Sequence, residues 1–255
     1  MGRKNNYFLI FTLTLLSILL IDTSSSTAQD SIKSCKIKTA VAFQSRYIWR
    51  GLPLGGAYPS IQPTLELSKG KFTLGAFGAF STSGLIPNQE VDLYANYTFL
   101  KDMFTFTVTD YFFPSDTVKY NYFNYDKKST VHVFETSLKF NGTAKIPFTL
   151  LIATNVHGND AKKANGDITY STYVELGYTK KVKETTLNVF LGSSLNTPGN
   201  DIPGYYATTK SGIVNLGLTA SKDIVISDKF SLPVSTSLIF NPDAKKIFFV
   251  FGFTL

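Results

Sequence analysis

From residue 37 onward, large apolar side chains recur at every second position along the chain. Residues 104–109, for example, read FTFTVT. Because successive side chains of a strand point to opposite faces, each such stretch has one apolar and one polar side. The pattern predicts an all-β fold of about twelve strands, and no stretch with helical periodicity interrupts the series. We expect these strands at residues 37–49, 60–69, 72–81, 90–99, 104–112, 131–140, 148–156, 171–180, 184–195, 213–222, 230–240 and 246–255.

The connections between these strands alternate between short and long. The short ones include the Asn141-Gly142 pair, a strong tight-turn signal. The long ones are rich in Gly, Pro, Asn, Asp and Lys, and only the link at 223–229 departs from the alternation. Transmembrane up-and-down β-barrels have tight periplasmic turns and longer external loops, and an even strand number returns both termini to the periplasm. A soluble β-sandwich, the alternative fold, has no reason to alternate its loops.

Aromatic residues gather at the two ends of the expected strands. At the periplasmic level we expect Phe72, Phe99, Phe104, Phe140, Phe148, Tyr178, Phe230 and Phe253, and at the opposite level Tyr47, Trp49, Tyr111, Phe112 and Phe113. Two aromatic girdles around an aliphatic band are typical of a lipid-facing barrel. In a sandwich the same rings would form the core, and more of them would lie in mid-strand.

The N-terminal residues have the layout of a secretory signal peptide. Arg3 and Lys4 precede the apolar residues 7–21, and small residues lead up to Ala28. We predict cleavage after Ala28, a short periplasmic segment at 29–36 and the outer-membrane barrel of a Gram-negative bacterium at 37–255. A retained anchor helix is the alternative, but the apolar run is short for a membrane span. Cys35 is the only cysteine, so no internal disulfide can form.

The formal charge of +7 comes from scattered lysines and forms no basic stripe, which argues against nucleic-acid binding. Lysines at strand ends suit contact with outer-membrane lipid headgroups and lipopolysaccharide. The two histidines, His132 and His157, have no serine neighbour on one strand face, and no metal-ligand spacing or phosphate-binding loop is found. We therefore expect no enzymatic activity, no cofactor and no metal site.

The polar faces of the strands are expected to line the barrel interior, because a charge on the lipid face costs about 2–4 kcal/mol at mid-membrane. Twelve strands lie between small filled barrels and sixteen-stranded channels, so we predict a narrow porin-like passage for small solutes or ions. The alternative is a non-conducting barrel with a structural or surface-binding role, in which Arg46 and nearby carboxylates form a salt-bridged plug. The expected lining residues are Gln44, Arg46, Gln62, Thr64, Glu66, Asp92, Asn96, Glu135, Lys139, Glu175 and Asn188.

The last expected strand alternates up to the C-terminus, from Ile247 through Phe249, Phe251 and Phe253 to Leu255. It resembles the C-terminal signal that the barrel-assembly machinery recognises in outer-membrane proteins. Its final residue departs from that signal, because Leu255 stands where Phe or Trp is usual. An ordinary closing strand is the alternative interpretation.

Residues 45–51, SRYIWRG, and the positions that follow carry a family resemblance. They are similar to the opening of the TorF-type porins, a bacterial family catalogued as being of unknown function. The resemblance covers about the first fifth of the expected mature chain and implies an outer-membrane barrel with channel activity, without naming a substrate. Arg46 departs from the family pattern, which has a small or acidic residue there. The matching residues are Tyr47, Arg50, Gly51, Pro59, Gln62, Gly75, Phe77 and Ser81.

Overall fold

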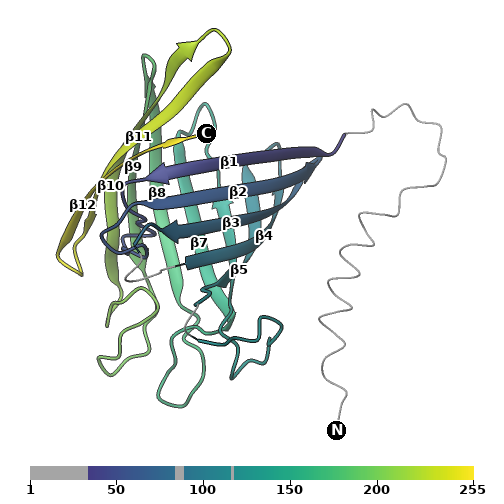
Figure 1. Cartoon of the computed structure of the whole chain (residues 1–255). Coiled ribbons are helices and arrows are strands. Elements are labelled where there is room, and N and C mark those ends of the chain that lie inside the picture. The colour runs from purple at the N-terminus through teal and green to yellow at the C-terminus, as the bar shows by residue number, and fades with distance from the viewer. Residues whose placement is uncertain (1–33, 84–88, 116–117) are drawn as a thin grey trace. The chain divides into compact units, whose positions relative to one another are not determined.

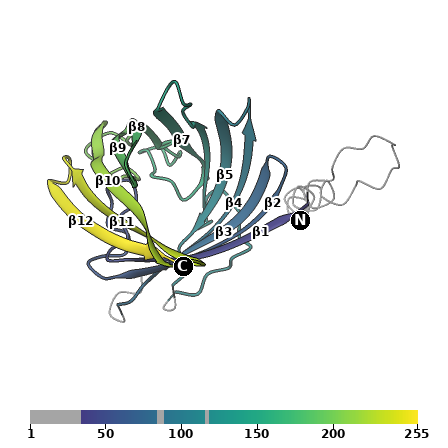
Figure 2. The same ribbon diagram turned by 90° about the horizontal axis from the view of Figure 1, so that it is seen from above.

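The chain forms one closed antiparallel β-barrel in a computed structural model that describes residues 34–83, 89–115 and 118–255. Each strand pairs with its sequence neighbours and the first pairs with the last, as Figures 1 and 2 show. The barrel predicted from the alternating pattern is confirmed. The expected signal peptide at 1–28 lies outside the described residues. The twelve strands are β1 (Lys36–Gln44), β2 (Ser60–Lys69), β3 (Phe72–Ser81), β4 (Gln89–Phe99), β5 (Phe104–Phe112), β6 (Val133–Phe140), β7 (Phe148–Gly158), β8 (Thr172–Val182), β9 (Thr185–Ser194), β10 (Gly212–Ser227), β11 (Phe230–Asn241) and β12 (Lys246–Thr254).

The alternating pattern places apolar side chains on the outside of the barrel. On β12, Phe249 and Phe251 are 63% and 61% exposed, whereas the alternate residues Phe248 and Val250 are buried inside. Leu93 on β4, which is 47% exposed, is another outward residue in the middle of its strand. No part of the described chain covers this outer face. Among the described residues, no helix is long and apolar enough to cross a membrane.

The barrel closes at a short seam between β1 and β12. Three residue pairs form it, from Ala42 opposite Thr254 to Gln44 opposite Gly252. Val41 and Leu255 exchange two further backbone hydrogen bonds of 2.9 Å. The last residue of the chain therefore takes part in closing the barrel, and the first residues of β1 pair only with β2.

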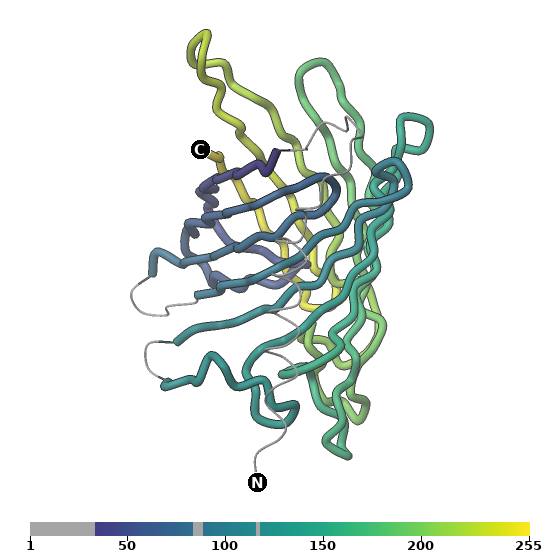
Figure 3. The backbone as a smooth tube through the Cα atoms, turned by 90° about the vertical axis from the view of Figure 1, so that its right-hand side faces the viewer, coloured from purple at the N-terminus to yellow at the C-terminus, as the bar shows by residue number. Residues whose placement is uncertain are grey.

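The two ends of the barrel differ in their connections. The links at 45–59, 113–132, 159–171 and 195–211 lie at one end, which we name the long-loop end, and tight turns lie at the other, the short-turn end. β10 continues to Ser227, further than predicted, so the turn to β11 is only residues 228–229. The apolar residues 224–226 extend the strand, with a register shift between Val225 and Ser227. The resulting hairpin projects from the short-turn end (Figure 3), and the loop alternation is more regular than the sequence indicated.

The aromatic girdle expected at the short-turn end forms in part. At the short-turn end the outward rings of Tyr97, Phe99, Phe104 and Phe140 follow one another at centroid distances of 5.4–6.1 Å. At the long-loop end the prediction is wrong in part. Tyr47, Trp49 and Tyr111 lie inside the barrel, because β1 ends at Gln44 instead of residue 49 and the chain then turns inward, and because Tyr111 is on the inner face of β5.

Candidate functional site in the barrel interior

The link between β1 and β2, residues 45–59, folds into the barrel, and we name it the inward loop. At its tip Trp49 and Leu52 exchange two backbone hydrogen bonds of 2.8 Å. Arg50 and Gly51 between them have φ of 50° and 80°, the pattern of a two-residue type I′ turn. Gly51 is required here, because a Cβ atom would lie 2.0 Å from the backbone oxygen of Val214. This turn presents Trp49 and Arg50 to the interior.

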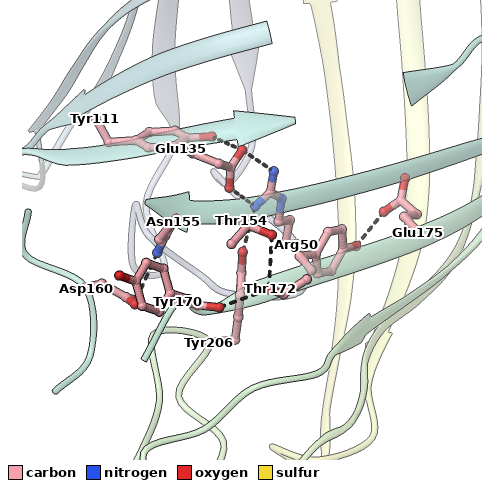
Figure 4. Close-up of polar contacts among 11 residues, drawn as sticks. Arg50, Tyr111, Glu135, Thr154, Asn155, Asp160, Tyr170, Thr172, Glu175 and Tyr206 are labelled. Atoms are coloured by element: carbon pink, nitrogen blue, oxygen red, sulfur yellow. Dashed lines mark hydrogen bonds and ion pairs between the residues drawn. The ribbon is translucent and has the colours of Figure 1, made fainter. Parts of the chain in front are cut away.

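Arg50 forms a two-pronged ion pair with Glu135 on the inner face of β6, as Figure 4 shows. Its two terminal nitrogens donate to the carboxylate oxygens at 2.5 and 2.8 Å, and one of them also donates to the Tyr206 hydroxyl at 2.8 Å. The side chains of Arg50 and Glu135 are 11% and 3% exposed. Burial works to lower the pKa of Arg50, but Tyr206 and Glu135 outweigh it and hold the pKa above its ordinary value. The guanidinium therefore stays charged.

Aromatic rings enclose this ion pair. The guanidinium carbon of Arg50 lies 4.4 Å from the ring centre of Trp49 and 4.7 Å from that of Tyr173. Trp49 stacks on Tyr206 at 5.8 Å and meets Tyr111 edge-on at 5.7 Å. Tyr206 belongs to the β9–β10 loop, so two long connections meet inside the long-loop end. Cation–π contacts of this kind strengthen when water is excluded.

Further contacts hold the inward loop to several strands. Asn241 on β11 donates to the Gly51 carbonyl at 3.1 Å. Arg46 donates to the Gly56 carbonyl at 3.2 Å and lies over the Phe248 ring of β12. On the other side Tyr47 packs near Phe77 of β3. The loop therefore contacts β3, β6, β11 and β12, which lie on different sides of the barrel, and it crosses the interior.

A second polar group lies beside the ion pair on β8 and β10. The Tyr173 hydroxyl donates to Glu175 at 2.5 Å, and Asn215 donates to both residues at 2.9 and 3.1 Å. Nearer the β7–β8 loop, Asn155 donates to Asp160 at 3.1 Å, as Figure 4 also shows. These bonds supply donors for carboxylates that would otherwise be buried without partners.

The expected lining residues lie inside the barrel, but they belong to two different environments. Near the long-loop end, Asp92, Glu135 and Glu175 are part of the packed interior. Toward the short-turn end the polar residues are more accessible and pair across strands, as in the 2.7 Å bond from Thr107 to Asn96. The residues of this second group are Glu66, Asn96, Lys139 and Asn188. Gln62 lies near the start of β2, close to the long-loop end, Thr64 lies in the middle of that strand, and Gln44 lies inside against Gly252 near the seam.

One expectation about these residues is wrong. Arg46 is not on a strand, and among the described residues it pairs with the Gly56 carbonyl and with no carboxylate. Arg50, known from the sequence only as a motif residue, makes the ion pair instead. Tyr173, Tyr206 and Asn215 are not among the expected lining residues. No periodic signal marks a loop tyrosine that returns to the interior.

The motif residues behind the family resemblance mostly hold the inward loop in place. Ser81 donates to the Gly55 carbonyl at 3.3 Å, and Phe77 contacts Tyr47. Gly75 leaves room for the Tyr94 ring, which a Cβ atom would approach to 2.1 Å. Tyr94 can then reach across β3 to donate to Glu66 at 2.9 Å. The motif therefore consists of residues of the inward loop and of the strands β2 and β3 beside it.

The buried His132 links the β5–β6 loop to β5. Its Nδ1 lies 2.7 Å from Asp110 and its Nε2 lies 2.7 Å from the Tyr122 carbonyl oxygen. These contacts fix the β5–β6 loop to the end of β5. Among the described residues, no group of three or more His, Cys, Asp or Glu side chains could hold a metal ion.

Comparison with known proteins gives a family and no activity. A family model described as a bacterial protein of unknown function (Gcw_chp) matches residues 28–205. No curated protein matches the chain. The match covers more than half of the chain, including the inward loop, Glu135 and Tyr205, and it carries neither the TorF name nor a channel assignment.

Proposed function

This chain belongs to the Gcw_chp family of bacterial proteins of unknown function, and we propose that it is an outer-membrane, porin-like channel for the passive passage of small solutes or ions. The observation that carries the proposal is the closed twelve-stranded barrel with an apolar outer face and polar inner faces. Exposed apolar surfaces of more than a few hundred Å² are rare on soluble monomers and mark contact with a membrane or a partner.

The interior supports a narrow passage. Accessible polar residues such as Glu66, Asn96 and Lys139 line the short-turn end. At the long-loop end the inward loop and the Arg50–Glu135 pair occupy the interior and would form the constriction. A constriction of this kind would restrict passage to ions and small solutes.

The same proposal includes export and assembly. The signal peptide would direct the chain to the periplasm, and the strand Ile247–Leu255 would be recognised by the barrel-assembly machinery. The outward rings of the short-turn end would lie at the lipid headgroups, and the long loops would face lipopolysaccharide. No catalytic step is part of the proposed function.

The test is conductance of the purified, folded barrel in planar bilayers. We expect small ionic conductance from the natural chain and larger conductance from Arg50→Ala, because the constriction loses its anchor. Lys71→Ala is the matched control, since it also removes an ion pair, with Asp102, but at an exposed turn between strands. Absence of conductance from all three proteins would contradict the channel, and equal conductance of all three would contradict the constriction at Arg50.

The packed site also favours a second candidate, the non-conducting barrel with a structural or surface-binding role. Tyr206 is 1% exposed and Trp49 is held between rings, so the inward loop fills part of the interior. This candidate predicts no conductance from the natural chain and conductance only from Arg50→Ala.

A further inference from the structure

A cavity of about 510 Å³ lies at the long-loop end, apart from the Arg50–Glu135 pair. It is bordered by the inward loop, the ends of β3 and β4, and the residues that follow β5. Binding cavities for small molecules commonly have volumes of about 300–1,000 Å³. The lining residues that matter below are Tyr47, Pro53, Gln89, Glu90, Phe113 and Pro114.

Glu90 gives this cavity a buried carboxyl group. Its side chain is 3% exposed, and its polar neighbours are Tyr47 and Asp92. Within the described chain, neither Glu90 oxygen accepts a hydrogen bond of normal geometry, and one oxygen of Asp92 is in the same condition. Burial and the charge of Glu90 raise the pKa of Tyr47 far above its ordinary value, so its hydroxyl stays protonated. Tyr47 is therefore uncharged and does not balance a charge on the carboxylates.

The other inward carboxylates are satisfied. Glu135 is paired with Arg50, Glu175 accepts from Tyr173 and Asn215, and Glu66 accepts from Tyr94. No ion pair joins Glu90 or Asp92 to a basic residue of the described ranges. The sequence of the adjoining links, residues 82–88 and 113–118, contains no Lys or Arg. Within the described ranges, this carboxylate pair therefore has no basic partner.

The walls of the cavity indicate what kind of cation would fit. Tyr47 and Phe113 offer aromatic rings, and Pro53 and Pro114 offer apolar surface. Aromatic faces attract organic ammonium groups, whereas divalent metal ions prefer several oxygen or nitrogen ligands. Among the described residues no set of three acidic, His or Cys side chains is available for a metal.

We propose that this cavity binds a small organic cation, with its ammonium group against Glu90 and a compact apolar body between Tyr47, Phe113 and the two prolines. This site goes beyond the channel proposed above and does not depend on it, because a barrel that conducts nothing can still bind the cation. Burial makes Glu90 a strong partner, since charge-assisted hydrogen bonds gain strength where water is excluded.

The experiment titrates phenethylammonium chloride into the folded, detergent-solubilised barrel and follows binding by calorimetry at neutral pH. The neutral 2-phenylethanol has the same apolar body and tests the need for charge. We expect the ammonium compound to bind about tenfold or more tightly than the alcohol, the difference that a hydrogen bond to a charged group supplies. No conductance is measured, so failure here is distinct from failure of the channel.

Glu90→Gln should abolish this preference, whereas Glu66→Gln, which changes an inward carboxylate that has its own partners, should leave it unchanged. Phe113→Ala at the rim provides a second variant that removes only an aromatic wall and should weaken binding of both compounds. Equal affinity for the two compounds, or full retention of the preference in Glu90→Gln, would overturn the proposal. Absence of any binding would do so as well and would indicate that Glu90 and Asp92 share a proton instead.

Discussion

Removal of the Arg50 guanidinium tests whether the inward loop is held by the ion pair. In Arg50→Ala, Glu135 would remain 3% exposed with Tyr111, which donates at 3.2 Å, as its remaining donor. Breaking a buried pair by deleting one partner costs about 3–5 kcal/mol, because a charge is left without compensation. We expect the free energy that holds the inward loop in the barrel to fall by that amount.

The chain provides its own reporter for this change. Trp49 is the only tryptophan, and it lies against both Arg50 and Tyr206. Its fluorescence during urea titration of the folded barrel therefore follows the loop, while gel migration without boiling follows the barrel. Arg50→Ala should shift the Trp49 transition to lower urea and leave the barrel transition in place.

A double variant separates the ion pair from simple loss of packing. Arg50→Met with Glu135→Gln removes both charges and keeps similar volumes, which is often nearly neutral for a buried pair. The double variant should therefore be more stable than Arg50→Ala. If both variants lose less than about 1 kcal/mol, the pair behaves like an exposed salt bridge and the reasoning is wrong.

Two further substitutions test the turn and the outer face. Gly51→Ala would place a methyl group against the Val214 carbonyl and should expose Trp49 to water, which a red shift of the Trp49 emission would report. The control is Gly199→Ala, because Gly199 also has a positive φ but lies in open space. This control should lower the stability by only about 1–2 kcal/mol and cause no red shift. Leu93→Lys puts a charge in mid-strand on the outside and should lower barrel stability in lipid vesicles by about 2–4 kcal/mol. Leu100→Lys, at a turn, should have little effect. Equal effects of the two substitutions would contradict a lipid-facing band.

The sequence was sufficient for the strands because their pattern is local. On β12 the alternation of Phe249 and Phe251 with buried neighbours can be read directly from the residues, and most strand bounds agree with the structure within a few positions. β10 and β1 are the exceptions, and β1 is the one that affects the site. Tyr47 and Trp49 continue the alternation past Gln44, but the Arg50-Gly51 turn and the contacts of its neighbours draw this segment into the interior.

The candidate site could not be derived in the same way, because it is built from contacts between residues far apart in the chain. Arg50 meets Glu135 and Tyr206 only after six and nine strands, respectively, have been arranged around the barrel. Alternation predicted that Glu135 faces inward, but nothing in it selects Arg50 over Arg46 as the partner. Likewise, only the three-dimensional surroundings of Glu90 show that, among the described residues, its oxygens have no hydrogen-bond donor.

The central claim is that the apolar outer faces of a closed barrel contact lipid in the bacterial outer membrane. Gel migration of the chain extracted from outer-membrane fractions, with and without boiling, tests it most directly. A closed barrel in lipid resists the detergent until it is heated, so we predict a compact, faster band that converts to the full-length position on boiling. Recovery of the chain in the soluble periplasmic fraction, with the same migration before and after boiling, would contradict the account.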